Sequence, residues 1–357
     1  MRCFWFSLVA LLSVSACEEK KEPRAKGKSD AEAPTGAAAV DPSLAKAVAG
    51  AAKPGDPAAP SAATDGPPES GVFEPGRADA ELKRGEQPKV VVGDAGQPPR
   101  RKLFSPLLPG WKETGQVELS LRAARQMMPP VTASVAFEAL KPKAGEEALG
   151  VPVTGKVSAI LVGELEGQVI PAELKTEVAK LKGGQIQFRV LGNGAAVDHR
   201  YELPKGADPN LNTLLRALSE ALASAALVFP SEEVGVGATW LVTSREFFSG
   251  ADTLGFQMLK LESLSEQTAT VSISTRRYAA TTALTLAGLP PGNHRLDQFQ
   301  FVAGGSVLVR PGSLFPYSGE VNQQLSAALV PEGNDQQRMG IQSALVSKVA
   351  VGKAPPG

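Results

Sequence analysis

The side chains best suited to acid–base chemistry are two histidines, His199 and His294, and each has an acidic residue nearby. His199 follows Asp198 and precedes Arg200 in an alternating segment that predicts a strand, so its two charged neighbours face the opposite side. His294 and Asp297 lie where a Pro-Gly turn leads into a strand. A catalytic set needs further partners in reach of each imidazole. We therefore interpret both histidines as structural, whereas a cleft that gathered either one with carboxylates and a serine would indicate an enzyme.

Motifs for nucleophilic, phosphate or metal chemistry are absent or out of context. The chain has no Gly-x-Ser-x-Gly, no His-Glu-x-x-His and no calcium loop of alternating acids. Ser43 and Lys46 fit Ser-x-x-Lys, but they lie in a segment that offers no pocket to activate the lysine. Gly27-Lys28-Ser29 imitates the end of a phosphate loop, yet Glu22 stands where the leading glycine belongs. The sequence therefore predicts no catalytic residue, no metal site and no cofactor.

The charge balance argues against a nucleic acid as partner. Lys plus Arg total 37 and Asp plus Glu total 37, so there is no basic surplus to displace counterions from phosphates. Both cysteines, Cys3 and Cys17, lie at the N-terminus. The rest of the chain therefore has no disulfide, no thiolate metal site and no cysteine nucleophile.

Two small clusters have both a functional and a structural interpretation. Arg100-Arg101-Lys102 could hold the protein near anionic lipid headgroups, at ~1 kcal/mol per cation, but we favour a solvated end of a linker. Met127 and Met128 could border an apolar cleft, because methionine adapts to varied ligands. For this pair we favour side chains that fill the core or a turn.

The N-terminus has the features of an export signal. Arg2 is followed by an apolar stretch over 4–14, which is too short for the ~20 residues that a membrane span needs. Val14-Ser15-Ala16-Cys17 resembles the lipobox of bacterial lipoproteins, in which a peptidase cuts before the cysteine after its thiol has been acylated. The alternative is an ordinary secretory signal cut after Ala16.

The lipobox resemblance implies a location for the protein in the cell. Acyl chains on Cys17 would anchor the protein to the membrane without a transmembrane helix, since two or more chains bind stably. Glu18 stands after the cysteine where an aspartate would retain an enteric-type lipoprotein in the inner membrane. The resemblance therefore implies the bacterial cell envelope and favours the outer membrane.

Composition divides the chain into four parts. Residues 1–16 form the signal peptide, and 17–102 form a linker in which Ala, Pro and Gly make up almost half of the residues. Such a segment buries too little apolar surface to offset ~1–2 kcal/mol of ordering entropy per residue, so we expect disorder. Val90, Val91 and Val92 are an exception and could form an edge strand of the body. Residues 103–351 form one domain, and 352–357 a disordered tail.

Alternating aliphatic residues predict an antiparallel β body within this domain. The patterns lie around Val117, Leu119 and Leu121; Val135, Phe137 and Ala139; Ile186, Phe188 and Val190; Val271 and Ile273; Phe299 and Phe301; Val307 and Val309; and Met339, Ile341, Leu345, Val349 and Val351. Gly304-Gly305 predicts a hairpin turn between two such runs, and residues 331–335 a turn before the last.

Two helices complete the predicted α+β fold. Asp208 and Pro209 are typical of a helix start, and leucines at helical spacing follow until Pro230 ends the segment. A second helix is predicted over 171–182, where Gly183-Gly184 provides the stop. We expect the Leu-rich helix to pack on a mainly antiparallel sheet.

The segment 229–240 resembles an uncharacterised family of bacterial lipoproteins. Members of that family carry a proline, then Val-Gly-x-Gly, then an aromatic residue that starts a strand, matched here by Pro230, Val234-Gly235-Val236-Gly237 and Trp240. They place a strand pair and a Leu-rich helix just upstream, and the resemblance covers 168–276. It implies an architecture and no activity. Physically, the two glycines permit a tight turn, and Trp240 would fill the core beneath the helix.

These observations favour a lipid-anchored envelope lipoprotein that is not an enzyme. We expect a binding or carrier module for an apolar ligand or an envelope component, because aliphatic residues are abundant and no catalytic set is present. The alternative is a structural or protein-interaction lipoprotein displayed on a long tether. The expected partners are the membrane, through the lipid on Cys17, and an apolar ligand or envelope protein.

Overall fold

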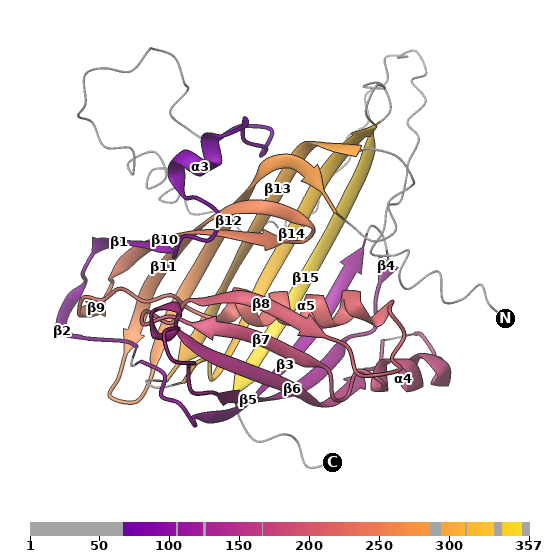
Figure 1. Ribbon diagram of the computed structural model, residues 1–357, viewed down its shortest axis with the longest axis horizontal. Coiled ribbons are helices and arrows are strands. Elements are labelled where there is room, and N and C mark those ends of the chain that lie inside the picture. Colours follow the sequence, from indigo (N-terminus) through magenta and orange to yellow (C-terminus); the bar gives the residue numbers. More distant parts are fainter. Residues whose placement is uncertain are drawn as a thin grey trace.

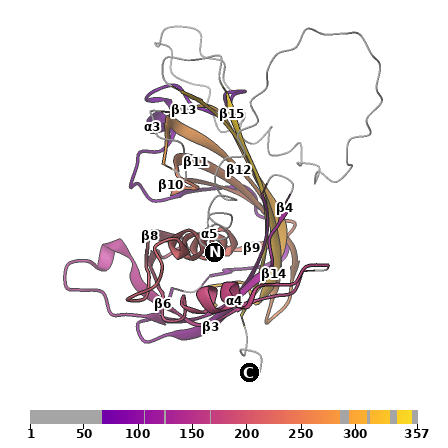
Figure 2. The same cartoon turned by 90° about the vertical axis from the view of Figure 1, so that its right-hand side faces the viewer.

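One strongly curved antiparallel sheet dominates the part of the protein that the computed structural model describes, residues 67–104, 106–123, 126–165, 167–285, 294–310, 313–331 and 338–351. Figure 1 shows the long strands side by side, and Figure 2 shows how the sheet bends around its concave side. The strands are β1 (Lys89–Asp94), β2 (Gln97–Arg101), β3 (Lys112–Ala123), β4 (Gln126–Met127), β5 (Val131–Ala139), β6 (Val151–Val162), β7 (Gln185–Val190), β8 (Ala196–Glu202), β9 (Val234–Val236), β10 (Thr239–Phe248), β11 (Ala251–Leu264), β12 (Ala269–Leu284), β13 (His294–Val309), β14 (Ser318–Pro331) and β15 (Met339–Val351).

The sheet joins two meanders through the last strand of the chain. Its order is β1-β10-β11-β12-β13-β14-β15-β3-β5-β6-β7-β8, with β4 beside β3. β15 therefore lies in the middle, paired with β14 on one side and with β3 on the other, from Ser343↔Ala123 to Val351↔Gly115. β2 and β9 form a small separate pair.

The predicted strands follow the alternation of the sequence. In β7, Ile186, Phe188 and Val190 are buried and the residues between them are more exposed. The same alternation places Val271 and Ile273 of β12 on the buried, concave face. Period-2 patterns therefore predicted the strands correctly, because each strand has one face toward the core.

The α+β fold class predicted from the sequence, with a Leu-rich helix as a layer on the sheet, is wrong. The α-helices of the described residues are short: α3 (Arg77–Glu81), α4 (Ala172–Ala179) and α5 (Leu211–Ala225) have 5, 8 and 15 residues, and η1 (Glu147–Leu149) is a 3-10 turn. Strands of up to 16 residues pair into one antiparallel sheet, which accounts for far more of the described residues than the helices do. The structure is an antiparallel β fold.

α5 lies on the concave side of the sheet, where it carries the chain from the β8 edge toward β10 (Figure 2). Its buried leucines 211, 215, 218 and 222 belong to the same apolar cluster as Val117, Phe137 and Ile186. A second cluster surrounds Trp240 and includes Phe299 and Phe301. None of the helices in the described part of the chain is long and apolar enough to cross a membrane.

Two local expectations are corrected. Gly304-Gly305 does not form a hairpin, because both residues lie inside the continuous strand β13. A Cβ on Gly305 would lie 2.0 Å from the carbonyl oxygen of Glu320, so this glycine permits the close approach of β14. α5 begins at Leu211 rather than at Pro209, and the side chain of Asp208 accepts a hydrogen bond from the backbone of Asn210 (2.8 Å).

The folded body begins before residue 103. α3, β1 and β2 lie within the segment that the sequence assigned to the linker. β1 is an edge strand whose Val90 and Val92 pair with Val242 and Trp240, which confirms the alternative of an edge strand here. The proposed signal peptide, the rest of the linker up to residue 66 and the tail at 352–357 lie outside the described residues.

Candidate functional site

The site begins at a gap between two central strands. β12 and β13 are paired continuously from Ala269↔Val309 to Arg277↔Phe301, but beyond that point they pair again only at Ala283↔Arg295. Residues 70–73 enter this gap from the N-terminal side of the body. We call the segment 70–73 the wedge.

The wedge completes the interrupted hydrogen bonds of both strands. The backbone N–H of Phe73 donates to the carbonyl of Ala279, and the N–H of Ala279 donates to Gly71, each at 2.8 Å. On the other side, the N–H of Phe299 donates to the carbonyl of Ser70 at 2.8 Å. Gly71 has φ +73°, and a Cβ there would lie 1.5 Å from the carbonyl oxygen of Phe299. Only glycine fits this position without displacing β13.

Arg245 of β10 fastens the segment that follows the wedge to the outer face of the sheet through a hydrogen bond to the carbonyl of Leu82. Arg245 binds Asp252 with two bonds, from Nε (2.8 Å) and Nη2 (3.0 Å), and donates from Nη1 to the carbonyl of Leu82 (3.0 Å). Phe73 packs against Tyr278, with ring centroids 5.7 Å apart. The wedge is therefore an integral part of the sheet.

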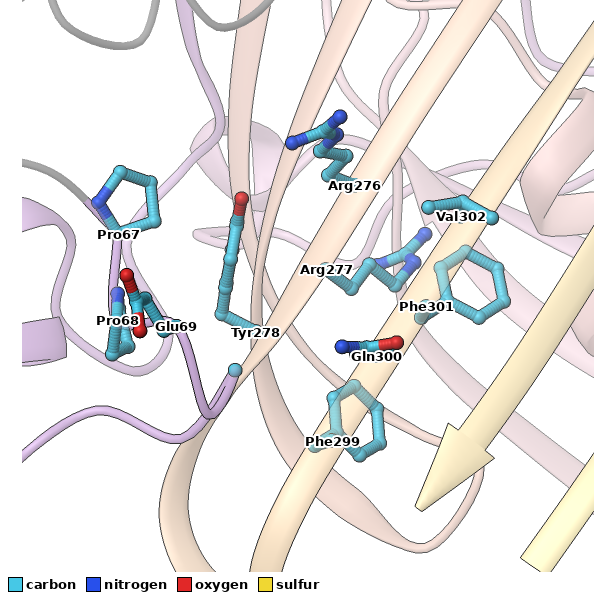
Figure 3. A pocket seen from close by; sticks show the side chains of 11 residues that line it. Pro67, Pro68, Glu69, Arg276, Arg277, Tyr278, Phe299, Gln300, Phe301 and Val302 are labelled. Carbon is cyan, nitrogen blue, oxygen red and sulfur yellow. The ribbon is translucent and has the colours of Figure 1, made fainter. Parts of the chain in front are cut away.

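A pocket of about 400 Å³ lies where the strands separate (Figure 3). This volume is in the range of small-molecule sites. Its lining combines apolar and aromatic side chains with two arginines, one glutamate and one amide. The lining residues are Pro67, Pro68, Glu69, Gly71, Arg276, Arg277, Tyr278, Phe299, Gln300, Phe301 and Val302.

Arg277 connects the pocket to a polar cluster on the concave side of the sheet. Its side chain is 8% exposed, forms an ion pair with Glu246, and has Cζ 4.5 Å from the ring centre of Phe248 and 5.6 Å from that of Phe301. To reach Glu246 it crosses β11 at Gly255, where a Cβ would lie 3.1 Å from Nη1. The guanidinium is thus held by charge and by two aromatic faces.

Glu220 joins α5 to this cluster. Its carboxylate accepts hydrogen bonds from the backbone N–H of Ser249 (3.1 Å) and from the Ser249 hydroxyl (3.4 Å), and the Nε of Arg216 lies 3.7 Å away. Burial raises the pKa of Glu220, although Arg216 and the Ser249 bond oppose that effect. These contacts tie the helix to the turn between β10 and β11.

His199 faces the same cluster and is held by stacking rather than by hydrogen bonds. Its ring lies 5.3 Å from that of Phe188, and neither ring nitrogen has a hydrogen-bond partner among the described residues. Burial lowers the pKa of His199, although the charge of Glu246 opposes this. Burial also acts to raise the pKa of Glu246, but the charge and hydrogen bond of Arg277 outweigh it and the pKa is lowered.

The sequence analysis took a histidine gathered with carboxylates and a serine as the indication of an enzyme. This cluster brings such residues near one another. Its bonds do not form a catalytic relay, however. The Ser249 hydroxyl donates its hydrogen bond to Glu220, and Glu246 forms an ion pair with Arg277. A nucleophile needs a base in hydrogen-bond reach, and neither nitrogen of His199 makes such a bond in the described structure. Nor do three metal-ligating side chains converge within the described ranges.

The other sequence candidates lie apart from the pocket and the cluster. Asp198 and Arg200 are exposed on the side of β8 opposite His199, as predicted. His294 begins β13 and pairs in register with Pro331, while Asp297 is bound by Arg338 at 2.8 Å.

The basic run and the methionine pair also differ in part from expectation. Arg100 donates to the carbonyl of Gly96 (2.9 and 2.7 Å) and Arg101 to that of Glu266 (2.8 Å), so they belong to the folded body and not to a solvated linker. Met127 is 49% exposed in the short strand β4. Cys17, Ser43, Lys46 and Gly27-Lys28-Ser29 lie outside the described residues.

Trp240 has the buried position that the sequence predicts, but under a different segment. It is 0% exposed, and its Nε1 donates to the carbonyl of Val228 at 2.8 Å. Its ring lies 6.4 Å from Phe229, so it packs beneath the chain that follows α5 rather than beneath the helix leucines. Gly237 has φ +85° in the predicted turn.

Sequence reasoning missed Arg276 and Arg277, although β12 contained a usable signal. Val271, Ile273 and Thr275 set the inward positions of this strand, and continuing the alternation places Arg277 inward as well. A charged residue at a core position of a strand needs a partner or a ligand. Its partner Glu246 lies two strands away, so no local pattern indicates it.

Comparison with known proteins gives no relative for this chain: no protein-family model matches it, and no curated protein matches it. The candidate site is therefore interpreted from its own geometry.

Proposed function

We propose that this chain is a lipid-anchored lipoprotein of the bacterial envelope and that it acts as a non-catalytic binding module for an apolar ligand or envelope component. The observation that supports binding is the pocket at the gap between β12 and β13, with Phe299, Phe301 and Tyr278 in its lining. Pockets of this size and partly aromatic lining are typical of small-molecule sites.

The anchor in this proposal is Cys17, and the expected site is the outer membrane. Wild-type protein expressed in bacteria fed a labelled fatty acid should carry the label and sediment with outer-membrane fractions. Cys17→Ser should carry no label, because serine has no thiol to acylate. Labelled Cys17→Ser, or an unlabelled wild type, would contradict the anchor.

Ligand binding can be tested in the native envelope by photo-crosslinking. A photoreactive phenylalanine at Gln300, an exposed pocket residue of β13, should capture a small apolar molecule that mass spectrometry can identify. The matched control is the same group at Ser306, which is exposed on β13 outside the pocket.

The outcome also separates the two candidate functions. A small-molecule adduct at Gln300 and none at Ser306 supports the binding module. A protein adduct would favour the structural or interaction lipoprotein instead. Equal or absent labelling at the two positions would contradict ligand binding in the pocket.

A further inference from the structure

Arg276 is a charged group of the pocket with no counterion. Among the described residues it forms no ion pair within 4.0 Å and no hydrogen bond, and its Nε is shielded from solvent without an acceptor. An unsatisfied buried donor costs about 1–3 kcal/mol. A ligand oxygen that accepted a bond from this guanidinium would remove that cost.

The second arginine of the pocket, unlike Arg276, has a counterion. Arg277 is neutralised by Glu246 on the concave side, so it contributes little net charge to the pocket. Glu69 is exposed and lies beyond ion-pair distance of Arg276. Of the two arginines in the lining, Arg276 is therefore the one whose guanidinium has no counterion among the described residues.

Polar and apolar side chains of the lining come from different positions of the two strands. Gln300 adds an amide, and Tyr278 adds a hydroxyl and an aromatic ring (Figure 3). Val302 pairs in register with Arg276, so it adds an aliphatic side chain on the same face of the sheet. A purely apolar ligand would leave Arg276 unpaired and desolvated. A small inorganic anion would leave the apolar surface of Tyr278 and Val302 without a contact.

We propose that the pocket binds an anionic amphiphile. Arg276 donates charge-assisted hydrogen bonds to the oxygens of its phosphate or carboxylate, and Tyr278 and Val302, on the same face of the sheet as Arg276, contact its apolar part. This inference rests on the proposed binding function and narrows it to one class of ligand.

The test compares three soluble probes by isothermal titration calorimetry. The full lipoprotein is held in nanodiscs of zwitterionic lipid, empty nanodiscs are subtracted, and hexyl phosphate, 1-hexanol and inorganic phosphate are titrated separately. Hexyl phosphate should bind at least tenfold more tightly than either of the other two. Arg276→Gln should reduce that affinity to the level of 1-hexanol, and Arg276→Lys should restore part of it. Arg200→Gln, which removes an exposed arginine of β8 outside the pocket, should change nothing.

Each other result has a definite meaning. Equal affinities for hexyl phosphate and 1-hexanol would overturn this inference and leave the apolar binding module standing. Inorganic phosphate binding as tightly as hexyl phosphate would indicate a free oxyanion and would also overturn it. If the Arg276→Gln variant still bound hexyl phosphate more tightly than 1-hexanol, the anionic group would bind elsewhere and the role of Arg276 would be overturned. No binding of any probe would contradict the proposed function itself.

Discussion

At the scale of single residues, the described structure concentrates its unusual chemistry in β8, β10, β12 and α5. Arg277 and Glu246 neutralise each other, whereas Arg276 and His199 have no hydrogen-bond partner in the described residues. An unsatisfied polar group inside a protein reduces stability unless it serves a ligand or a reaction. Arg276 lines a pocket in which a bound ligand could accept its hydrogen bonds, whereas His199 is not among the residues that line this pocket.

The position of His199 leads to a prediction about acid stability. Burial lowers the pKa of His199 from its usual 6.5, so the unfolded chain binds a proton more readily than the folded one. Stability should therefore fall as the pH drops from above 6.5 toward the folded-state pKa. His199→Phe retains the stacking on Phe188 and removes the titrating group. Urea unfolding at pH 7.5 and 5.5 should show a smaller loss for His199→Phe than for wild type.

His294→Gln provides the control, because it removes the other histidine at a site outside the cluster. It should retain the wild-type loss between the two pH values. At pH 7.5, His199→Phe should be at least as stable as wild type, since a ring without polar partners replaces two unsatisfied nitrogens. An unchanged pH dependence in His199→Phe would show that other groups control acid stability.

At the scale of elements, the wedge distinguishes this sheet from a simple meander. It inserts a short parallel bridge, Val72↔Ala279, between two antiparallel strands. The backbone groups that β12 and β13 would otherwise leave unpaired are satisfied by residues 70, 71 and 73. The pocket exists because the strands separate here to admit the wedge.

Gly71 tests how far the sheet depends on the wedge. Gly71→Ala should lower the free energy of unfolding by about 3 kcal/mol or more, because a left-handed φ costs ~1–2 kcal/mol and the Cβ would also collide with the carbonyl of Phe299. Hydrogen exchange at the amides of Ala279 and Phe299 should become faster. The measurements are urea unfolding and exchange followed by mass spectrometry.

Gly76→Ala is the matched control for the steric part of this effect. Gly76 also has a left-handed φ, +81°, but nothing lies within 4 Å of its Cβ position. It should cost only the backbone strain, about 1 kcal/mol. Equal losses for the two variants would mean that the contact with β13 is not essential.

Elements also show where sequence reasoning succeeded and failed. Strands such as β7 and β12 were predictable, because burial of one face leaves a period-2 pattern in the sequence. Gly304-Gly305 misled because a glycine in a strand can permit a close approach of a neighbour as well as a turn. The wedge was not predictable, because its partners lie more than 200 residues away and the segment itself is rich in proline and glycine.

At the scale of the whole molecule, two apolar clusters share one sheet. β15 contributes Met339 and Ile341 to the cluster around Trp240, and Val349 to the cluster that includes the α5 leucines. The fold class could not be predicted from the sequence, because it depends on contacts between residues that are far apart in the chain. Pairing of β15 with β3 closes a separation of more than 200 residues, and no local pattern reports such a contact. The helical spacing of the leucines is a clear local pattern, so it led to the prediction of a helical layer. The described structure is instead one curved antiparallel sheet with a single 15-residue helix at this segment.

Because β15 belongs to both clusters, the two meanders should unfold together. Trp240 reports on one cluster and Trp111 packs against the other, so Trp111→Phe and Trp240→Phe each leave one body tryptophan as the probe. In each variant, the urea midpoint from fluorescence should coincide with that from far-UV circular dichroism. The variants can differ in stability without affecting the comparison, since both probes are read on the same sample. A fluorescence midpoint that departs from the dichroism midpoint in either variant would show two independent folding units and would contradict the role of β15 as the strand that joins them.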